Sequence, residues 1–386
     1  MLLGPQKAPR VLFVLGSGVS SGICPGVEKI TAAVLETKIA PSDWNTSILE
    51  AADELHAVQG FLRALRAEAV QTIDKPNYED LSSLCLRLEN HELRLRPDPG
   101  LTRFRDTVFR STAQFHRRYP GGCFYGSAPL AAISARSRGF INETVRQLLR
   151  PHRETQGELQ LVVETIRAYG PEHVDILTLN HDLLLEDALT KAGIAWTDGF
   201  ETPLSTDSKA LQFDRGAFTK PGRVRILKIH GGCDWYLCLM APKRWSPLKL
   251  LKGADRWRYT TDYEESQTLT GSTTKGDSYT RGVFGELNWE ARKLLREHDR
   301  IVCSGYGWRD EAFNAMLKDW SDEHKEARML LLHDRAEIKE FEGRKKPWPW
   351  PDDWKEDGGS SWVRWQPSWL SETRIEEINE KLFGGK

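Results

Sequence analysis

The chain has 386 residues, which is enough for one large domain with insertions or for two smaller ones. Its 54 basic and 55 acidic residues give a formal net charge of −1, which argues against a protein dedicated to binding nucleic acid. The opening MLLGPQKAPR lacks the apolar core of a signal peptide, and no apolar run approaches a membrane span. Six scattered cysteines indicate reduced thiols, so we expect a cytoplasmic protein without a membrane partner.

Five short apolar runs predict the strands of one sheet. None of them alternates with polar residues, so we expect strands that are covered on both faces, as in a parallel sheet. The predicted fold class is therefore α/β, with a Rossmann-like parallel sheet. The runs are VLFVL (11–15), VDILTL (174–179), VRILKI (224–229), RIVCSG (300–305) and RMLLLH (328–333).

Most of the chain between the first two runs has apolar residues at the three- and four-residue spacing of helices. We therefore expect a single domain over residues 1–386 that carries a large helical insertion at about 41–172. A second stretch, about 242–285, is polar and is predicted to be rich in loops. The predicted helices of the insertion cover residues 47–70, 78–88, 104–119 and 158–170.

The first strand runs directly into the small residues Gly16, Ser17, Gly18 and Ser20. Small residues after a buried strand let backbone N–H groups approach a pyrophosphate, and the helix that follows adds a favourable dipole. A tight structural connection between strand and helix is the alternative. A dehydrogenase would show a second strand ending near Glu36, but the sequence after it, TKIAPSDW, does not resemble a buried strand.

Polar side chains follow the next two strands. Asn180 and Asp182 lie where the second strand gives way to a helix, although capping that helix would need only one of them. His230 follows the third strand and precedes Gly231 and Gly232, which leave room for a ligand, so we favour a role in a site. The fourth strand leads into another small-residue turn, SGYGWRDEAF (304–313).

These motifs, LGSGVSSGICPG, TLNHD, KIHGG and CSGYGWRDE, resemble in order and spacing those of sirtuin-like domains. The resemblance is strongest to the bacterial branch that hydrolyses NAD+ in antiphage defence. It implies that Asp182 accepts the carboxamide N–H of nicotinamide, that Asn180 positions the ribose or the attacking water, and that His230 is the general base. It also assigns NAD binding to Gly16, Ser17, Gly18, Ser20, Gly305 and Tyr306.

Two departures from the family pattern bear on function. Protein-deacylating sirtuins carry a zinc ribbon of two close cysteine pairs, whereas here only Cys233 and Cys238 follow the histidine, so we expect no metal. Leu179 stands where the family often has glutamine. The resemblance further implies a homo-oligomer and a separate HerA-type ATPase partner, with the helical insertion and the Trp-rich C-terminal tail (PWPWPDDW and SSWVRWQPSW) as contact surfaces.

The sequence thus favours a NAD+ hydrolase that releases ADP-ribose and nicotinamide, acting in antiviral defence by depleting NAD+. One alternative is a subunit that binds NAD or ADP-ribose and regulates a nuclease or ATPase complex without chemistry of its own. Another is a protein deacylase that consumes NAD, which the missing zinc ribbon disfavours. A third alternative is nuclease activity within a complex, which basic stretches such as HRR (116–118) and RSR (136–138) suggest, although a charge run is usually a solvated face. Direct contact with nucleic acid is not expected.

Overall fold

The computed structural model describes the chain except for short segments and the two ends. The described residues are 10–37, 48–95, 98–116, 128–150, 157–206, 208–240, 244–252, 254, 265–268, 270, 275–324, 326–333 and 363–384.

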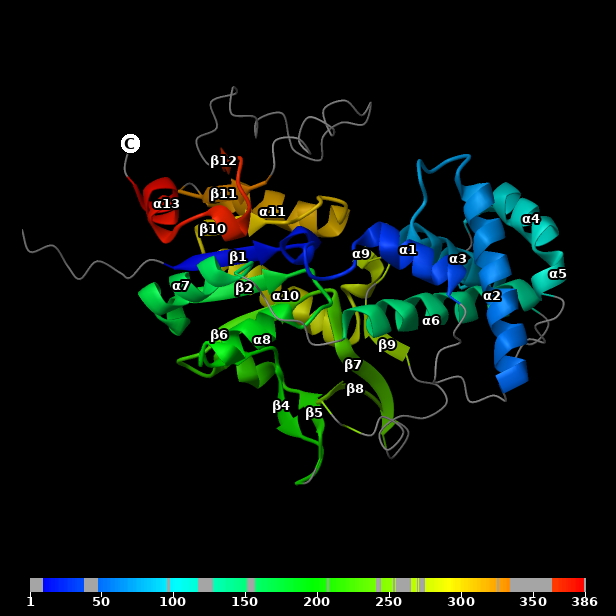
Figure 1. Cartoon of the computed structure of the whole chain (residues 1–386), viewed down its shortest axis with the longest axis horizontal. Helices are drawn as coiled ribbons and strands as arrows, with labels where there is room; N and C mark the ends of the chain where they lie inside the picture. Colours follow the sequence, from blue (N-terminus) through cyan, green and yellow to red (C-terminus); the bar gives the residue numbers. More distant parts are fainter. Residues whose placement is uncertain are drawn as a thin grey trace, which may run out of the picture.

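A seven-stranded sheet forms the centre of the fold, with the order β12-β11-β10-β1-β2-β6-β3 and parallel pairing throughout (Figure 1). All five predicted strands are confirmed, and so is the Rossmann-like α/β class. The two edge strands, β3 and β12, were not predicted because each is too short for a pattern. The strands are β1 (Val11–Leu15), β2 (Val174–Thr178), β3 (Trp196–Thr197), β6 (Val224–Lys228), β10 (Arg300–Ser304), β11 (Arg328–Leu332) and β12 (Val363–Gln366).

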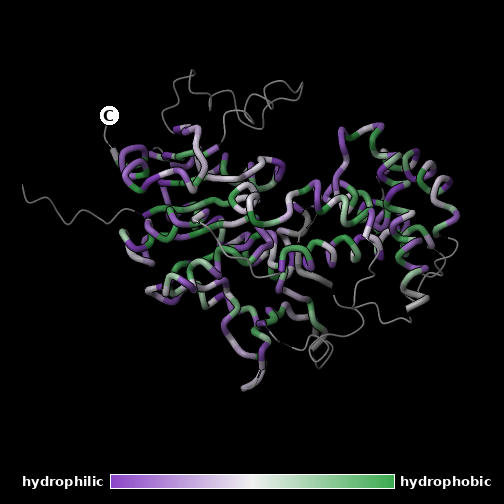
Figure 2. Tube along the Cα trace, viewed as in Figure 1, coloured by the Kyte–Doolittle hydropathy of each residue, from purple (hydrophilic) through white to green (hydrophobic). Residues whose placement is uncertain are grey.

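Alternate residues of β1 face two different hydrophobic clusters, which explains why its sequence is apolar without interruption. Val11, Phe13 and Leu15 pack into one cluster with the helices of the N-terminal half, and Leu12 and Val14 into another with α10 and α11. Both faces of the sheet are therefore covered. Figure 2 shows hydrophobic residues concentrated along the central strands.

Helices fill most of the chain between β1 and β2. In Figure 1, α2 to α6 lie together on one side of the sheet, while α7 lies beside β2. The predicted helices are confirmed where they are described; residues 117–119 and the insertion's proposed start at 41–47 lie outside the described residues. The helices are α1 (Val27–Glu36), α2 (Ile48–Ala69), α3 (Tyr78–Glu92), α4 (Thr102–Ser111), α5 (Ala113–His116), α6 (Pro129–Leu149) and α7 (Gln160–Tyr169).

A second, antiparallel sheet has the order β4-β5-β8-β7-β9. Its strands β8 and β9, with helix α9, fall within 242–285, so the described part of that stretch is more regular than the loop that we expected. The difference arises because β8 and β9 both pair with β7, a long-range contact that the polar local sequence does not reveal. The elements are β4 (Phe200–Pro203), β5 (Ala210–Phe213), β7 (Gly231–Met240), β8 (Arg244–Leu250), β9 (Glu265–Thr268) and α9 (Lys275–Ser278).

The remaining helices connect the later strands of the main sheet. They are α8 (Leu184–Lys191), α10 (Gly282–Glu297), α11 (Glu311–Glu323) and α13 (Ile375–Ile378). No helix in the described part of the chain is long and apolar enough to cross a bilayer. The PWPWPDDW segment of the proposed contact tail lies outside the described residues.

Candidate functional site

Four adjacent strands, β10, β1, β2 and β6, end at the same edge of the main sheet because they are parallel neighbours. Their carboxyl ends carry all the motifs singled out in the sequence, and ligands bind at this edge in open α/β sheets. Hydrogen bonds connect the four ends in sequence, from the Gly16 loop to the Gly305 loop, to His230, to Asn180 and back to Gly16.

The loops after β1 and β10 are in direct backbone contact. Gly16 N donates to Ser304 O at 3.0 Å, and Gly18 N donates to Gly305 O at 2.9 Å. A Cβ on Gly16 would lie 2.4 Å from Gly305 O, and one on Gly18 would lie 2.7 Å from Gly305 Cα. The two glycines are therefore required by the close approach of two chain segments, and their N–H groups bond within the protein.

The chain after Gly16 forms a short 3-10 helix, Ser17–Ser20, and α1 begins only at Val27. The expected helix N-terminus therefore does not follow directly on the glycines. Ser17 is exposed at the edge of the sheet, whereas Ser20 is buried and its Oγ donates to Ser17 O at 3.2 Å. Within the 3-10 helix, Ser17 is therefore the residue that is exposed to a ligand.

Asn180 fixes the end of β2 to the loop after β1. Its Nδ2 donates to Gly16 O at 3.0 Å and lies 3.5 Å from Ser20 Oγ. Its Oδ1 is buried and has no hydrogen-bond partner among the described residues. An unsatisfied buried acceptor is costly, so a ligand that donates a hydrogen bond to this oxygen is favoured here.

Asp182 serves the start of α8 and also faces a pocket. One carboxylate oxygen, Oδ1, accepts from Leu184 N at 3.2 Å in the turn that leads into α8. The N-cap of α8 is Leu183, so neither Asn180 nor Asp182 is the capping residue. Beneath it, Lys228 Nζ donates to Asp182 O at 2.5 Å and pairs with Glu186 at 2.8 Å. Burial alone would lower the pKa of Lys228, but the charge of Glu186 raises it, so the lysine remains charged.

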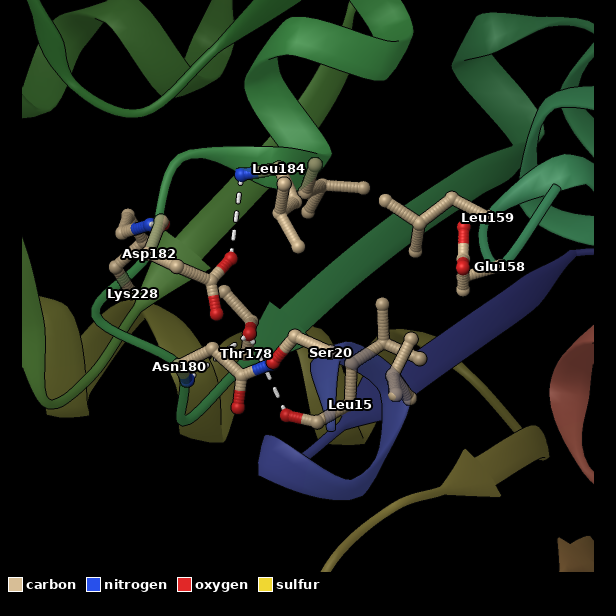
Figure 3. A pocket seen from close by; sticks show the side chains of 11 residues that line it. Leu15, Ser20, Glu158, Leu159, Thr178, Asn180, Asp182, Leu184 and Lys228 are labelled. Carbon is tan, nitrogen blue, oxygen red and sulfur yellow. Dashed lines mark hydrogen bonds between the residues drawn. The ribbon is translucent and has the colours of Figure 1, made fainter. Parts of the chain in front are cut away.

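A narrow pocket lies between the ends of β1 and β2 (Figure 3). Polar groups of Ser20, Asn180 and Asp182 face apolar side chains across it. Because the space is narrow, a ring could enter only if the apolar wall shifts. The pocket is lined by Leu15, Val19, Ser20, Glu158, Leu159, Thr178, Asn180, Asp182, Leu184, Leu185 and Lys228.

His230 lies toward the other face of the sheet. It is 4% exposed, and its Nε2 is 2.7 Å from Asp310 Oδ2 and 2.8 Å from Tyr279 Oη. Tyr279 packs in the cluster that contains α10 and α11, whereas the apolar wall of the pocket, including Leu184, belongs to the opposite cluster. The pocket that Asn180 lines and the imidazole of His230 therefore lie toward opposite faces of the sheet.

Backbone contacts join His230 to Asn180. His181, which follows Asn180, donates from Nδ1 to Gly231 O at 3.2 Å, and Cys233 N donates to His181 O at 2.9 Å. The rings of His181 and His230 are 6.1 Å apart between centroids. The predicted residues Asn180 and His230 are therefore held on adjoining, mutually bonded segments.

The electrostatic surroundings keep His230 neutral near pH 7. Burial and the positive charge of Lys275 lower the pKa of His230, and the bond to Asp310 offsets only part of that shift. Burial would raise the pKa of Asp310, but the hydrogen bonds from His230 and Tyr279 hold it below the usual range. A neutral imidazole beside an ionised carboxylate is suited to accept a proton.

Gly305 and Tyr306 take different roles in the last turn. Gly305 has a positive φ of 66°, and a Cβ there would lie 2.4 Å from Val19 N. Tyr306 is buried, and its Oη lies 2.7 Å from Asn314 Oδ1 and 3.2 Å from Asp310 O. The hydroxyl of Tyr306 therefore supports the loop that carries Asp310.

Sequence reasoning missed four residues around the imidazole. Asp310 was seen only as part of a turn, and Tyr279 and Lys275 fell in the stretch expected to be loop. Lys275 Nζ lies 3.3 Å from Glu79 Oε1, so α3 of the helical insertion also contributes a residue to the site. Glu79 lies in the first turn of α3, and nothing local in the sequence relates it to a histidine about 150 residues later.

In the described residues, no group of three or more His, Cys, Asp or Glu side chains is arranged to hold a metal ion. Cys233 and Cys238 both lie on β7, but they pack in different hydrophobic clusters, as an odd spacing along a strand requires. Burial raises the pKa of the Cys233 thiol, so it remains protonated.

Comparison with known proteins bears on the part of the chain that carries these residues. No protein with a curated description matches the chain. The family model of the SIR2-like domain matches residues 174–349, a range that includes Asn180, His230 and Asp310. Strand β1 lies outside that range, yet it pairs with β2 and β10 at the centre of the same sheet. Residues 174–349 are therefore similar to the SIR2-like domain, and β1 completes the sheet to which their strands belong.

Proposed function

We propose that this protein hydrolyses NAD+ at the bond between nicotinamide and ribose, giving ADP-ribose and nicotinamide. The observation that carries the proposal is the setting of Asn180. Its buried Oδ1 lacks a partner among the described residues, it lines a pocket with Asp182, and the next residue, His181, is bonded to the segment that carries His230. A ribose hydroxyl is a donor that would satisfy this oxygen.

In the proposed reaction, a water oxygen attacks the anomeric carbon of the ribose while its bond to the nicotinamide nitrogen breaks. The bonding electron pair returns to the ring, so nicotinamide leaves as a neutral molecule and no strong acid is required. Positive charge develops on the ribose ring in the transition state, as in other glycosidic cleavages. His230 takes the proton from the attacking water and passes it to solvent, which accounts for the one proton released.

The remaining residues have binding roles in this proposal. Asp182 accepts the carboxamide N–H of nicotinamide in the pocket, after the apolar wall has shifted. Ser17, which is exposed, contributes its hydroxyl to the phosphates, while Gly16, Gly18 and Gly305 allow the two loops to lie close together. Ser20 and Tyr306 support those loops from within.

The test is to incubate the purified chain with NAD+ and to quantify nicotinamide and ADP-ribose by chromatography. We expect turnover by the wild type and a loss of about 10²–10⁴-fold in His230→Ala, which removes the base. His173→Ala is the matched control, because this partly buried residue directly precedes β2, at the end of the strand away from the site. Circular dichroism confirms that each variant is folded. NAD+ binding without turnover would instead support the regulatory subunit, and deacetylation of acetylated peptides would support the deacylase.

We further propose that the hydrolysis serves antiviral defence by depleting NAD+ in the cytoplasm. A homo-oligomer and a separate HerA-type ATPase are the proposed partners, on the strength of the family resemblance alone. The test is to compare NAD+ levels and the size of the assembly with and without the ATPase. An assembly that leaves NAD+ unchanged during infection would contradict this role.

A further inference from the structure

Only one nitrogen of the His230 ring has hydrogen-bond partners in the described part of the chain. Nε2, Tyr279 Oη and Asp310 Oδ2 form a triangle with sides of 2.8, 2.7 and 2.5 Å, and the shortest is the bond that Tyr279 donates to Asp310. No described residue bonds to Nδ1. The two ring nitrogens are therefore in chemically different settings.

The position of the ring proton follows from the donors in this triangle. Hydrogen bonds keep Asp310 ionised, so its oxygen can only accept. Burial and the charge of Asp310 raise the pKa of Tyr279, so the tyrosine retains its single proton and gives it to Asp310. Nε2 faces the same carboxylate oxygen at 2.7 Å and must also donate to it, since two acceptors at this distance would repel. The proton of the neutral ring is thus on Nε2, and Nδ1 carries the lone pair.

We propose that Asp310 is a positioning residue that holds His230 in the Nε2–H tautomer and so makes Nδ1 the base, while the hydrogen bond from Tyr279 moderates the charge on Asp310. This inference rests on the proposed NAD+ hydrolysis for its catalytic meaning, but the tautomer itself can be observed without substrate. The charged and titratable groups that act on the ring are Asp310, Tyr279, His181, Lys275 and Glu79.

The carboxylate of Asp310 is itself held rigidly. Its Oδ1 accepts from Phe313 N at 3.0 Å and caps α11, while Oδ2 serves His230 and Tyr279. Asparagine is an equally good capping residue and nearly the same size, so Asp310→Asn retains the helix cap. The new amide would direct an N–H toward Nε2, which would then have to accept, and the ring proton would move to Nδ1.

The decisive experiment is ¹⁵N NMR of the full chain labelled at histidine, with the His230 signals identified by their absence in His230→Gln. We expect a protonated Nε2 and an unprotonated Nδ1 in the wild type, and the reverse in Asp310→Asn. A wild type with its proton on Nδ1, or on both nitrogens at neutral pH, would overturn the inference. So would an unchanged tautomer in a folded Asp310→Asn protein.

Kinetics then test the catalytic meaning. Asp310→Asn is expected to lower kcat for nicotinamide release by about 10²–10⁴-fold with little change in KM, because the base is blocked rather than the binding. Tyr279→Phe keeps the carboxylate and the tautomer, but loss of its bond leaves more charge on Asp310. The acid limb of its pH profile should therefore move up, by about half a unit to one unit. A wild type that released no nicotinamide would refute the proposed function and leave the NMR result standing.

Discussion

Asn180 and Gly16 are 164 positions apart in the chain, yet Asn180 Nδ2 donates a 3.0 Å hydrogen bond to Gly16 O. This bond connects the end of β2 to the end of β1 at the edge where the other two motif-bearing strands also finish. It occupies the donor half of the amide and leaves the acceptor half, Oδ1, buried beside the pocket. The same side chain thus holds the loop and offers an oxygen to a ligand.

The first prediction concerns the donor half of this amide. Asn180→Asp retains the shape but loses the donor to Gly16 O, and it places a carboxylate against that carbonyl oxygen. We expect unfolding to become easier by about 1–3 kcal/mol, the cost of an unsatisfied buried group. Nicotinamide release should also fall by more than tenfold, measured beside thermal unfolding. Wild-type values for both quantities would show that the bond matters little.

A second prediction concerns the contact between the two loops. Gly18→Ala places a Cβ 2.7 Å from Gly305 Cα, so the loops must separate, and we expect a destabilisation of about 1–3 kcal/mol with lower activity. Gly22→Ala is the matched control, since a Cβ there meets nothing within 4 Å. Its stability should change by less than about 1 kcal/mol. Denaturant unfolding of both variants provides the measurement, and equal effects would argue against the packing explanation.

The third prediction concerns the ion pair between Glu79 on α3 and Lys275 near His230. Lys275 lowers the pKa of His230 and Glu79 raises it. Glu79→Gln should therefore move the acid limb of the pH profile for nicotinamide release to lower pH, because the imidazole becomes harder to protonate. Lys275→Met should move it to higher pH. Shifts in the same direction for both variants would contradict the electrostatic account.

A fourth prediction concerns the buried pair beneath the Asp182 loop. Lys228→Met leaves the Glu186 carboxylate, whose pKa burial already raises, without its cation and should cost about 3–5 kcal/mol. The double variant Lys228→Met/Glu186→Leu should lose less, because no uncompensated charge remains. A double-mutant cycle by denaturant unfolding measures the coupling. If the losses of unfolding free energy in the two single variants simply add up in the double variant, a direct interaction between Lys228 and Glu186 is excluded.

The sequence predicted those parts of the fold whose signal is local. Strands such as β1 and β6 are apolar on both faces, and that pattern is visible without a neighbour. The antiparallel sheet was missed because β8 and β9 become strands only by pairing with β7. Helix α6 lies within the predicted helical insertion but was not singled out, since buried polar residues such as Ser134 and Ser137 obscure its apolar face.

The residues of the candidate site also fall into two groups, those with a local signal in the sequence and those without one. Asn180, Asp182 and His230 follow strands directly, so their position could be predicted from the end of an apolar run. The partners of His230 could not, because Tyr279 and Asp310 are 49 and 80 positions away along the chain and meet the ring only in the folded protein. Glu79 lies on α3 and Lys275 on α9, two other segments of the chain. They meet only because α3 packs close to the site.

The central place of β1 has a consequence for biosynthesis. β1 pairs with β2 along one edge and with β10 along the other, where Leu12 lies opposite Ile301. The second edge of β1 therefore stays unpaired until nearly 290 further residues have been translated. Until then an apolar, unpaired edge is available to chaperones or to other nascent chains. Slow emergence of β10 from the ribosome should therefore favour aggregation, whereas strands β10 and β11, which follow one another closely, can join the sheet within moments of each other.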